Sequence, residues 1–462
     1  MDMSPEEFRS AGHRVVDWIA DYLGQAGSYP VLPNVQPGDL LRQLPDCAPA
    51  HGEGIEDILA GFEQQIMPAM THWNHPRFFA YFANSACAPG ILAEMLSAAL
   101  NANGMLWKSS PASTELEQTT LQWLLKALGF PPGWFGIIYD TASVSTMHAI
   151  AAAREQADPE VRSRGGDGRL TLYTSEHSHN SVEKGALTLG IGRNNVRRIG
   201  TDSQFRMCPA ALEKAILSDQ SNGKHPFCVV ATVGTTSTAS IDPVPAIAAI
   251  AQRHGLWLHV DAAYGGSAAI VPELRGYFEG VDEADSLVVN PHKWLFAPMD
   301  LSVLYTNRPE ILRRAFSLSA EYLKTAQDSE AVNYMDYGVP LGRRFRSLKL
   351  WFILRYFGSA GLAEMVRSQI TWARDLARLI EQDPGFEVSA PTLLSLVCFR
   401  YRGSNEQNQR LLNEINASGK AFLSHTVLNG EFVLRFSIGN IHTTWKDVED
   451  TWQLIRGLAA KL

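Results

Sequence analysis

Short β-branched runs alternate with alanine-rich helical stretches between about residues 86 and 355, and this alternation constrains the fold more than any other feature. Residues 228–233, 257–260 and 286–289 have the composition of buried strands, and residues 244–252 are typical of a helix. Such alternation predicts βαβ units that build a mostly parallel sheet. We therefore expect an α/β fold.

The segments on either side have different patterns. Residues 1–85 begin with a helix signal, in which Ser4 is the cap and Pro5 the first helical residue, and they hold little apolar core of their own. Residues 356–462 combine amphipathic helices at about 362–382 and 406–417 with a hairpin around Asn429-Gly430. We expect three parts: an N-terminal helical segment (1–85) that packs onto another part or subunit, a large domain (86–355), and a small C-terminal α+β domain (356–462).

Charge and hydropathy exclude several classes of protein. The net charge is −8 without a long run of one sign, which argues against a nucleic-acid partner. No apolar stretch reaches about 18 uncharged residues, so we expect no membrane span. The N-terminus is acidic and lacks an apolar signal core, which predicts a cytoplasmic location. The five cysteines are scattered and form no CxxC pair, as in a reduced protein.

Three runs place reactive residues where predicted strands end. One strand ends on Asp261, and another ends in an Asn-Pro turn that presents Lys293. A third is followed by Thr141-Ala142-Ser143 at the start of a helical pattern. Ligands collect at the carboxyl ends of parallel strands, and small hydroxyl residues at a helix N-terminus suit a phosphate.

An acid, a lysine and a phosphate cradle together match the needs of pyridoxal 5′-phosphate (PLP). The lysine would bind the cofactor aldehyde covalently, and the acid would keep the pyridine nitrogen protonated. Each element alone has an ordinary explanation: a strand-terminal Asp is usually a turn residue, a lone Lys a surface charge, and Thr-Ala-Ser a helix cap. Their conjunction on an α/β background favours the cofactor site.

The same runs closely resemble the group II PLP-dependent decarboxylases, specifically the aromatic-L-amino-acid decarboxylases. The resemblance covers nearly the whole chain. The matching motifs are Asn290-Pro-His-Lys-Trp294, His259-Val-Asp-Ala-Ala-Tyr264, Thr71-His-Trp73, Phe78-Phe-Ala-Tyr81-Phe82, Ser109-Ser-Pro-Ala-Ser-Thr-Glu115, His179-Asn-Ser-Val-Glu183, Gly234-Thr-Thr236, Tyr322-Leu-Lys324 and Pro340-Leu-Gly342-Arg-Arg-Phe-Arg-Ser347.

The resemblance implies a type I PLP-dependent (aspartate aminotransferase-like) fold, with a mostly parallel sheet of the seven-stranded type. It implies a homodimer whose active sites lie at the interface and whose N-terminal helices clasp the partner. Lys293 would carry PLP, Asp261 would bind its ring nitrogen, and Ala263 and His179 would pack on its two faces. The phosphate would be surrounded by Thr141, Ala142, Ser143, Asn290 and His292.

The resemblance also implies a carboxy-lyase that converts DOPA, tryptophan, 5-hydroxytryptophan, tyrosine or phenylalanine to the amine and carbon dioxide. Tyr322 would lie on a mobile loop and protonate the α-carbon after carbon dioxide leaves. The substrate would contact Thr236 near its carboxylate and the residues Trp73, Tyr81, Phe82, Asn103, Met105 and Gly342. Without the resemblance, the aromatic residues among these would be assigned to the core.

The sequence departs from animal members of the family at several positions. Ala83-Asn84 replaces Pro-Thr, Asp140 replaces a Gly before the phosphate cradle, and Asn103 and Met105 replace Ile and Phe at positions that reach the neighbouring subunit's pocket. The exact substrate therefore stays open. Gly342 resembles the plant relatives that accept indoles.

Three other functions fit the sequence less well than an aromatic-amino-acid decarboxylase. An aldehyde synthase, which couples decarboxylation to oxidative deamination, has Phe at the Tyr322 position in the family, so Tyr322 argues against it. An aminotransferase would not share these motifs, and a non-catalytic binding protein would not keep the reactive residues. No metal is expected, because His177 and His179 lack HExxH spacing and a matching carboxylate.

Overall fold

The computed structural model describes residues 2–318 and 331–462, and its core is a seven-stranded sheet in the order β1-β7-β6-β5-β4-β2-β3. All strand pairs from β6 to β3 are parallel, and only β7 runs in the opposite direction among the described strands. The predicted mostly parallel sheet is confirmed. The strands are β1 (Phe135–Tyr139), β2 (Leu170–Ser175), β3 (Val196–Ile199), β4 (His225–Thr232), β5 (Trp257–Asp261), β6 (Ser286–Val289) and β7 (Ser302–Thr306).

Helices cover both faces of this sheet, because successive strand residues point to opposite sides. Ile137 and Val230 pack with α6 (Ala142–Ala157), α8 (Ser181–Thr188) and α12 (Pro309–Phe316). Their neighbours Ile138 and Val229 pack on the other face. The helices there are α5 (Pro111–Leu128), α9 (Pro209–Ser221), α10 (Val244–His254) and the first half of α13 (Ser347–Glu381). Two short helices, α7 (Val161–Arg164) and α11 (Pro291–Trp294), lie in connections.

The C-terminal part is a four-stranded antiparallel sheet with helices on it. Its order is β10-β11-β9-β8, from β8 (Phe386–Val388), β9 (Leu396–Tyr401), β10 (Ser424–Leu428) and β11 (Glu431–Ser437), and it packs with α14 (Asn405–Ala417) and α15 (Trp445–Ala459). The hairpin turn has Asn429 and Gly430 in the left-handed region, as its sequence predicted. Helix α13 is kinked at Gly358, whose backbone is not helical, close to the predicted boundary at residue 355. The division of the chain into three parts stays a prediction.

An N-terminal segment is built into this C-terminal part. The Phe79 N–H donates to the Phe422 carbonyl, the Ser437 N–H donates to the Phe79 carbonyl, and the Phe79 ring lies 4.0 Å from that of Phe436. Phe79 is fully buried in the same apolar cluster as α14 and α15. Residues near 79 therefore belong spatially to the small sheet, although they precede the large one in the sequence.

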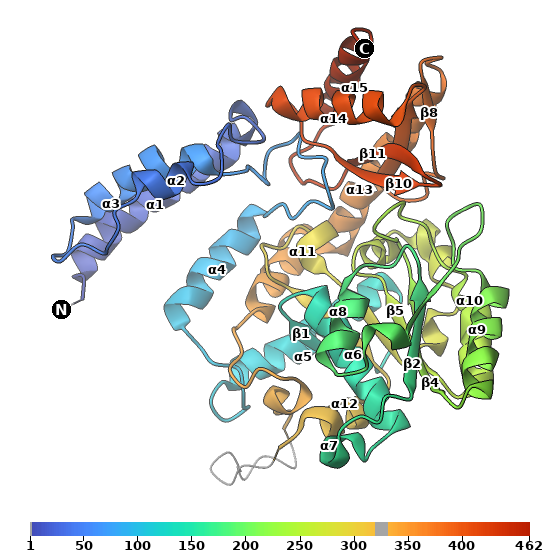
Figure 1. Ribbon diagram of the computed structural model, residues 1–462. Helices are drawn as coiled ribbons and strands as arrows, with labels where there is room; N and C mark the ends of the chain where they lie inside the picture. The colour runs from blue at the N-terminus through green and yellow to red at the C-terminus, as the bar shows by residue number, and fades with distance from the viewer. Residues whose placement is uncertain (1, 319–330) are drawn as a thin grey trace.

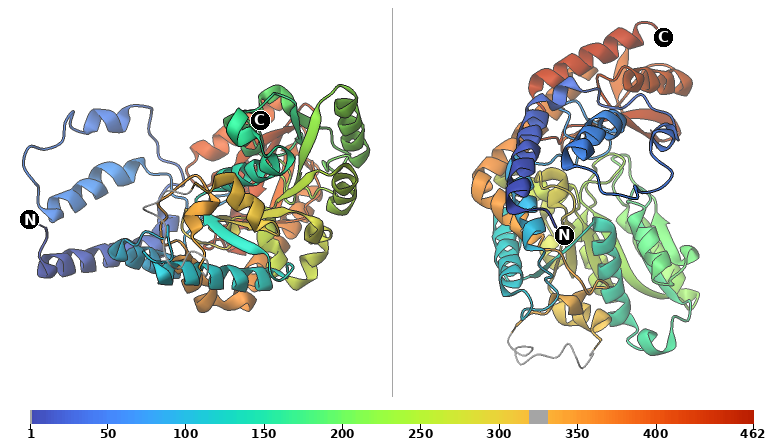
Figure 2. Two further views of the ribbon diagram at one scale, coloured as in Figure 1. Left: turned by 90° about the horizontal axis from the view of Figure 1, so that it is seen from below. Right: turned by 90° about the vertical axis from the view of Figure 1, so that its left-hand side faces the viewer.

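The first helices project from the rest of the chain as a lobe (Figures 1 and 2). These are α1 (Pro5–Gln25), α2 (Asp39–Gln43) and α3 (Ile55–Gly61), and α4 (Ala88–Leu100) lies between the lobe and the body. The predicted Ser4 cap is present as a capping box with Glu7. However, α1 buries only Ala11, while Phe8 is 68% and Leu41 76% exposed. Within the described residues, no helix is both long and apolar enough to cross a membrane.

Three histidines are enclosed in this fold away from the cavity described below. His75, His148 and His259 are at most 4% exposed, and burial lowers the pKa of each to about 4. The unfolded chain binds a proton at each of them near pH 6.5. Because their folded pKa values are depressed, they contribute stability above that pH, which is lost as the pH falls toward 4.

We expect the free energy of unfolding to be lower at pH 5.5 than at pH 7.5. The loss is on the order of 1 kcal/mol for each of the three histidines, and a few kcal/mol together, from their lowered pKa values. Urea unfolding followed by tryptophan fluorescence, at one protein concentration, measures this difference. A free energy of unfolding that does not fall at pH 5.5 would contradict this prediction.

Candidate active site

The carboxyl ends of the parallel strands meet at one edge of the sheet, and a cavity of about 310 Å3 opens there. Every residue that the sequence assigned to the cofactor lines it: Thr141, Ala142, Ser143, His179, Thr236, Asp261, Ala263, Asn290, His292 and Lys293. Each comes from the segment just after β1, β2, β4, β5 or β6. Trp73, Tyr81 and Phe82, three of the expected substrate contacts, line the same cavity.

Lys293 lies on α11, directly after β6. The Pro291 turn starts this short helix, and the Lys293 N–H donates to the Asn290 carbonyl at 2.9 Å. Burial lowers the pKa of the Lys293 amine, and the nearby Asp261 carboxylate acts in the opposite direction. A lysine with a lowered pKa has a larger neutral fraction, which is the nucleophilic form that attacks an aldehyde.

Asp261 ends β5 with its carboxylate inside the protein. It is 5% exposed, and its Oδ1 accepts a hydrogen bond from the Ala263 N–H at 3.0 Å. A buried carboxylate needs more than one such bond to offset its lost hydration. The site is therefore suited to a cationic group on a ligand.

The N-terminus of α6 faces the cavity with small residues. Thr141 is the N-cap, and its carbonyl accepts the Val144 N–H at 3.1 Å, whereas the N–H groups of Ala142 and Ser143 have no partner inside the helix. Asp140 accepts hydrogen bonds from the N–H and hydroxyl of Thr141 and does not line this cavity. The Asp140 carboxylate is thus directed away from the cavity, and the N-terminus of α6 keeps its preference for an anion.

Two polar atoms at the cavity are left without partners among the described residues, namely Asn290 Oδ1 and Thr232 Oγ1. The other end of the Asn290 amide lies 3.2 Å from Nε2 of His292, whose Nδ1 accepts the Leu301 N–H at 2.8 Å. Burial and the Lys293 charge lower the pKa of His292 to about 3, so the ring is neutral at pH 7. Buried polar atoms of this kind are satisfied by a polar ligand.

His179 follows β2 and is neutral as well. Burial lowers its pKa, and the Lys293 charge lowers it further against the effect of Asp261. Its Nδ1 accepts the Ser181 N–H at 3.1 Å, so the proton of the neutral ring is on Nε2. A neutral imidazole can lie against a flat ligand without the cost of burying a charge.

An aromatic wall closes one side of the cavity. The Trp73 ring lies 6.1 Å from that of Tyr81 and 4.3 Å from that of Phe78. The Phe82 ring stacks on Tyr264 at 3.7 Å, and the Lys293 amine lies 5.6 Å from the Phe82 centroid. Rings of a ligand can pack against this wall beside the lysine.

The remaining expected substrate residues lie apart from this cavity within one chain. Asn103, Met105 and Gly342 are neighbours of one another: Asn103 Oδ1 accepts the Arg343 N–H at 2.9 Å, and its amide nitrogen lies 3.7 Å from the Met105 sulfur. A Cβ added to Gly342 would meet only Asn103, at 3.7 Å. Gly342 lines a separate cavity of about 170 Å3. Tyr322 lies outside the described residues.

Sequence reasoning missed Arg435 of β11, which also lines the cavity. Its guanidinium is buried 5.3 Å from the Phe82 centroid, and it donates to the carbonyls of Thr236 at 2.7 Å and Ser237 at 3.1 Å. Among the described residues it makes no ion pair. The only signal was an arginine between Leu434 and Phe436, within the otherwise apolar run of residues 432–436.

Residues 37–402 match the family model described as the pyridoxal-dependent decarboxylase conserved domain. This chain belongs to that family of decarboxylases. Tyrosine decarboxylase 4 of Petroselinum crispum is 41% identical, with 100% of this chain and 94% of that protein covered. Phenylacetaldehyde synthase of Arabidopsis thaliana is also 41% identical, covering 100% and 97%. A crystal structure of Oryza sativa TDC with PLP and tryptamine superposes with a TM-score of 0.97 at 36% identity, covering 100% and 99%.

The decarboxylase therefore has the predicted type I PLP fold and uses pyridoxal 5′-phosphate. The cavity fits this cofactor on its own chemistry. It supplies an amine of lowered pKa, a buried carboxylate, a helix N-terminus for the phosphate and two unsatisfied polar atoms.

Proposed function

We propose that this decarboxylase removes the carboxylate of an aromatic L-amino acid as carbon dioxide and releases the aromatic amine. The observation that carries the proposal is the wall of Trp73, Tyr81 and Phe82 on the same cavity as Lys293. Similar proteins named tyrosine decarboxylase and tryptophan decarboxylase support an aromatic substrate.

Each side chain of the cavity then has a definite task. Lys293 would hold PLP covalently, Asp261 would keep its ring nitrogen protonated, and His179 and Ala263 would flank the ring. The phosphate would be held by Thr141, Ala142, Ser143, Asn290 and His292, with Thr236 near the substrate carboxylate. When bound, PLP withdraws electrons from the bonds of the substrate α-carbon. The wall orients the substrate so that the carboxylate is the group released.

Two further side chains complete the proposal, the guanidinium of Arg435 and the phenol of Tyr322. Arg435 is a buried cation without an ion-pair partner among the described residues, and it attracts the anionic end of a substrate toward Thr236. Tyr322 would deliver the proton to the α-carbon, since a phenol is protonated at neutral pH. The second candidate function, aldehyde synthesis, draws support from the similar phenylacetaldehyde synthase. Tyr322 is the residue that argues for amine formation instead.

The projecting lobe supports a homodimer. Its helices leave Phe8 and Leu41 exposed, and an apolar surface of this kind is expected to be covered. Asn103, Met105 and Gly342, which lie away from the Lys293 cavity of their own chain, would then complete the cavity of the partner. The cytoplasmic location stays a prediction of the sequence.

A substrate panel tests the function and the role of Gly342 together. We expect amine and carbon dioxide in equal amounts from L-DOPA, and also from tryptophan and 5-hydroxytryptophan because the open space at Gly342 leaves room for an indole. Product assays with these amino acids, tyrosine, phenylalanine and glutamate measure this. Aldehyde and ammonia as the main products would identify a synthase. A kcat/KM for tyrosine far above that of every indole would contradict the role of Gly342.

A further inference from the structure

A buried chain of hydrogen bonds joins α11, the helix that carries Lys293, to the aromatic wall. The chain runs through Trp294, Gln369 and Asn440, which do not line the cavity. The Trp294 Nε1–H, next to Lys293, donates to Gln369 Oε1 at 2.6 Å, and Gln369 Nε2 donates to the Asn440 carbonyl at 2.9 Å. The Asn440 amide then donates to the carbonyls of Trp73 at 2.8 Å and His75 at 3.0 Å. Trp294, Gln369 and Asn440 are at most 3% exposed.

A second route joins the same helix to the other end of the wall. The Trp294 ring stacks on Tyr264 at 4.6 Å with an interplanar angle of 5°, and Tyr264 stacks on Phe82 at 3.7 Å. The segment from Trp73 to Phe82 is thus connected at both ends to the residue beside Lys293. One connection is directional and polar, and the other is a stack that tolerates sliding.

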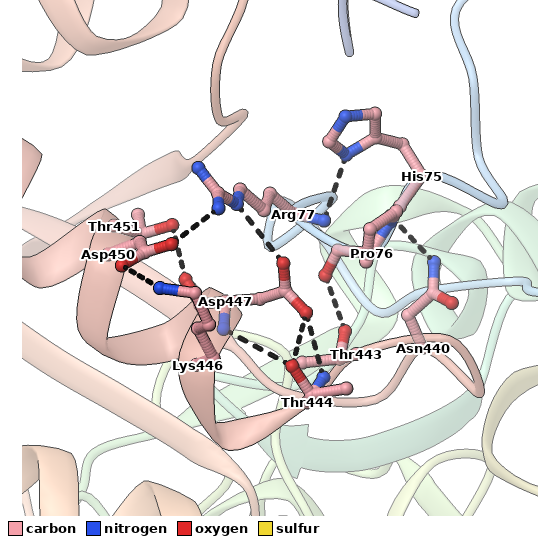
Figure 3. Close-up of polar contacts among 10 residues, drawn as sticks. All are labelled: His75, Pro76, Arg77, Asn440, Thr443, Thr444, Lys446, Asp447, Asp450 and Thr451. Carbon is pink, nitrogen blue, oxygen red and sulfur yellow. Dashed lines mark hydrogen bonds and ion pairs between the residues drawn. The ribbon is translucent and has the colours of Figure 1, made fainter. Parts of the chain in front are cut away.

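The outer side of the segment is anchored separately, as Figure 3 shows. The Thr443 hydroxyl donates to the Pro76 carbonyl at 2.5 Å, and Arg77 binds Asp447 at 3.1 Å and Asp450 at 2.8 Å on α15. These contacts hold Pro76 and Arg77 on α15 and the loop before it, and none of them is made by the Asn440 side chain. A change at Asn440 removes the inner link, together with the bond that its Oδ1 accepts from the His442 N–H at 2.9 Å.

We propose that Gln369 and Asn440 are positioning residues that fix the distance between the Lys293 helix and the Trp73 wall, and thereby determine which aromatic side chain the cavity accepts. Neither residue lines the cavity. Their hydrogen bonds favour a single position of Trp294 relative to Trp73. Movement of either residue would break these bonds and leave buried polar groups without partners. The inference rests on the proposed role of Trp73 as a substrate contact.

The test compares Asn440→Ala and Gln369→Met with a matched control. Asn408 is likewise fully buried in the small domain, its amide donates to two carbonyls at 3.0 Å, and its Oδ1 accepts one N–H at 2.8 Å. Asn408→Ala thus removes the same number and kind of hydrogen bonds as Asn440→Ala, but its partners are Tyr401 and Ser404 and not the segment at Trp73. We measure kcat and KM for tryptophan and tyrosine in the holoenzyme, the retention of PLP, and hydrogen exchange of the backbone at residues 71–84.

We expect Asn440→Ala and Gln369→Met to raise KM for the preferred substrate about tenfold with kcat changed less than threefold, because the wall holds the side chain equally in the ground and transition states. The ratio of kcat/KM between tryptophan and tyrosine should move closer to one. Backbone hydrogen exchange at residues 71–84 should become faster, and PLP should be retained. Asn408→Ala should leave all of these measurements unchanged even if it lowers the free energy of unfolding.

Distinct results separate the two proposals. Unchanged KM, preference and exchange in both relay variants, or the same changes in Asn408→Ala, would overturn the positioning role. Trp73→Ala is tested in parallel: if it leaves KM and preference unchanged, the substrate role of the wall fails instead. If Asn440→Ala does not fold, Gln369→Met decides the question, because it leaves Asn440 and its bonds to Trp73 and His75 in place.

Discussion

Replacement of Lys293 by Ala should abolish turnover, by at least on the order of 10⁴-fold, because the variant lacks the amine that we propose holds the cofactor covalently. Among the described residues no other lysine lines the cavity, so no neighbour can replace it. The visible absorbance of covalently bound PLP should disappear as well. Steady-state assays and the absorbance spectrum of the purified variant measure the two effects.

The control is Lys184→Ala. Lys184 is an exposed residue of α8 whose charge reaches His179 but which does not line the cavity. The Lys184→Ala variant should keep both its activity and the visible absorbance of bound PLP. Retention of the visible band with normal turnover in Lys293→Ala would remove Lys293 from the mechanism.

Replacement of Asp261 by Asn should keep PLP bound but lower kcat on the order of a hundredfold or more. The amide is nearly the same size and can still accept the Ala263 N–H, but it has no charge to stabilise a protonated ring nitrogen. Asp285→Asn is the control, since Asp285 precedes β6 at the opposite edge of the sheet and binds Arg308. A loss under threefold in Asp261→Asn would contradict the charge role.

Much of this fold follows from local sequence signals. Residues 228–233, 257–260 and 286–289 became central strands because their apolar runs are buried on both faces. The Asn429-Gly430 turn depends on contacts within a few residues, so the local sequence was enough to predict it. The reactive residues were predictable for the same reason, since each lies at the end of a strand of the large sheet or in the segment that follows it.

The remainder depends on contacts between segments that are far apart in the chain. The reversed direction of β7 is set by its neighbours β1 and β6 and not by its own five residues. Arg435 faces the cavity only because the small sheet is packed against the loop at Thr236. Gln369 and Asn440 are ordinary amide residues in the sequence, and nothing near them indicates a bond to Trp73 or Trp294.

The insertion of Phe79 between Phe422 and Ser437 has a consequence for the order of events during synthesis. A ribosome releases residues near 79 long before it makes the strands that they join, and chains fold as their segments emerge. The large sheet with its lysine can form first, whereas the aromatic wall must wait for residues 422–437. A chain that stops short of β11 would then hold Lys293 without the packed wall, so the cavity can be completed only after β11 has been made.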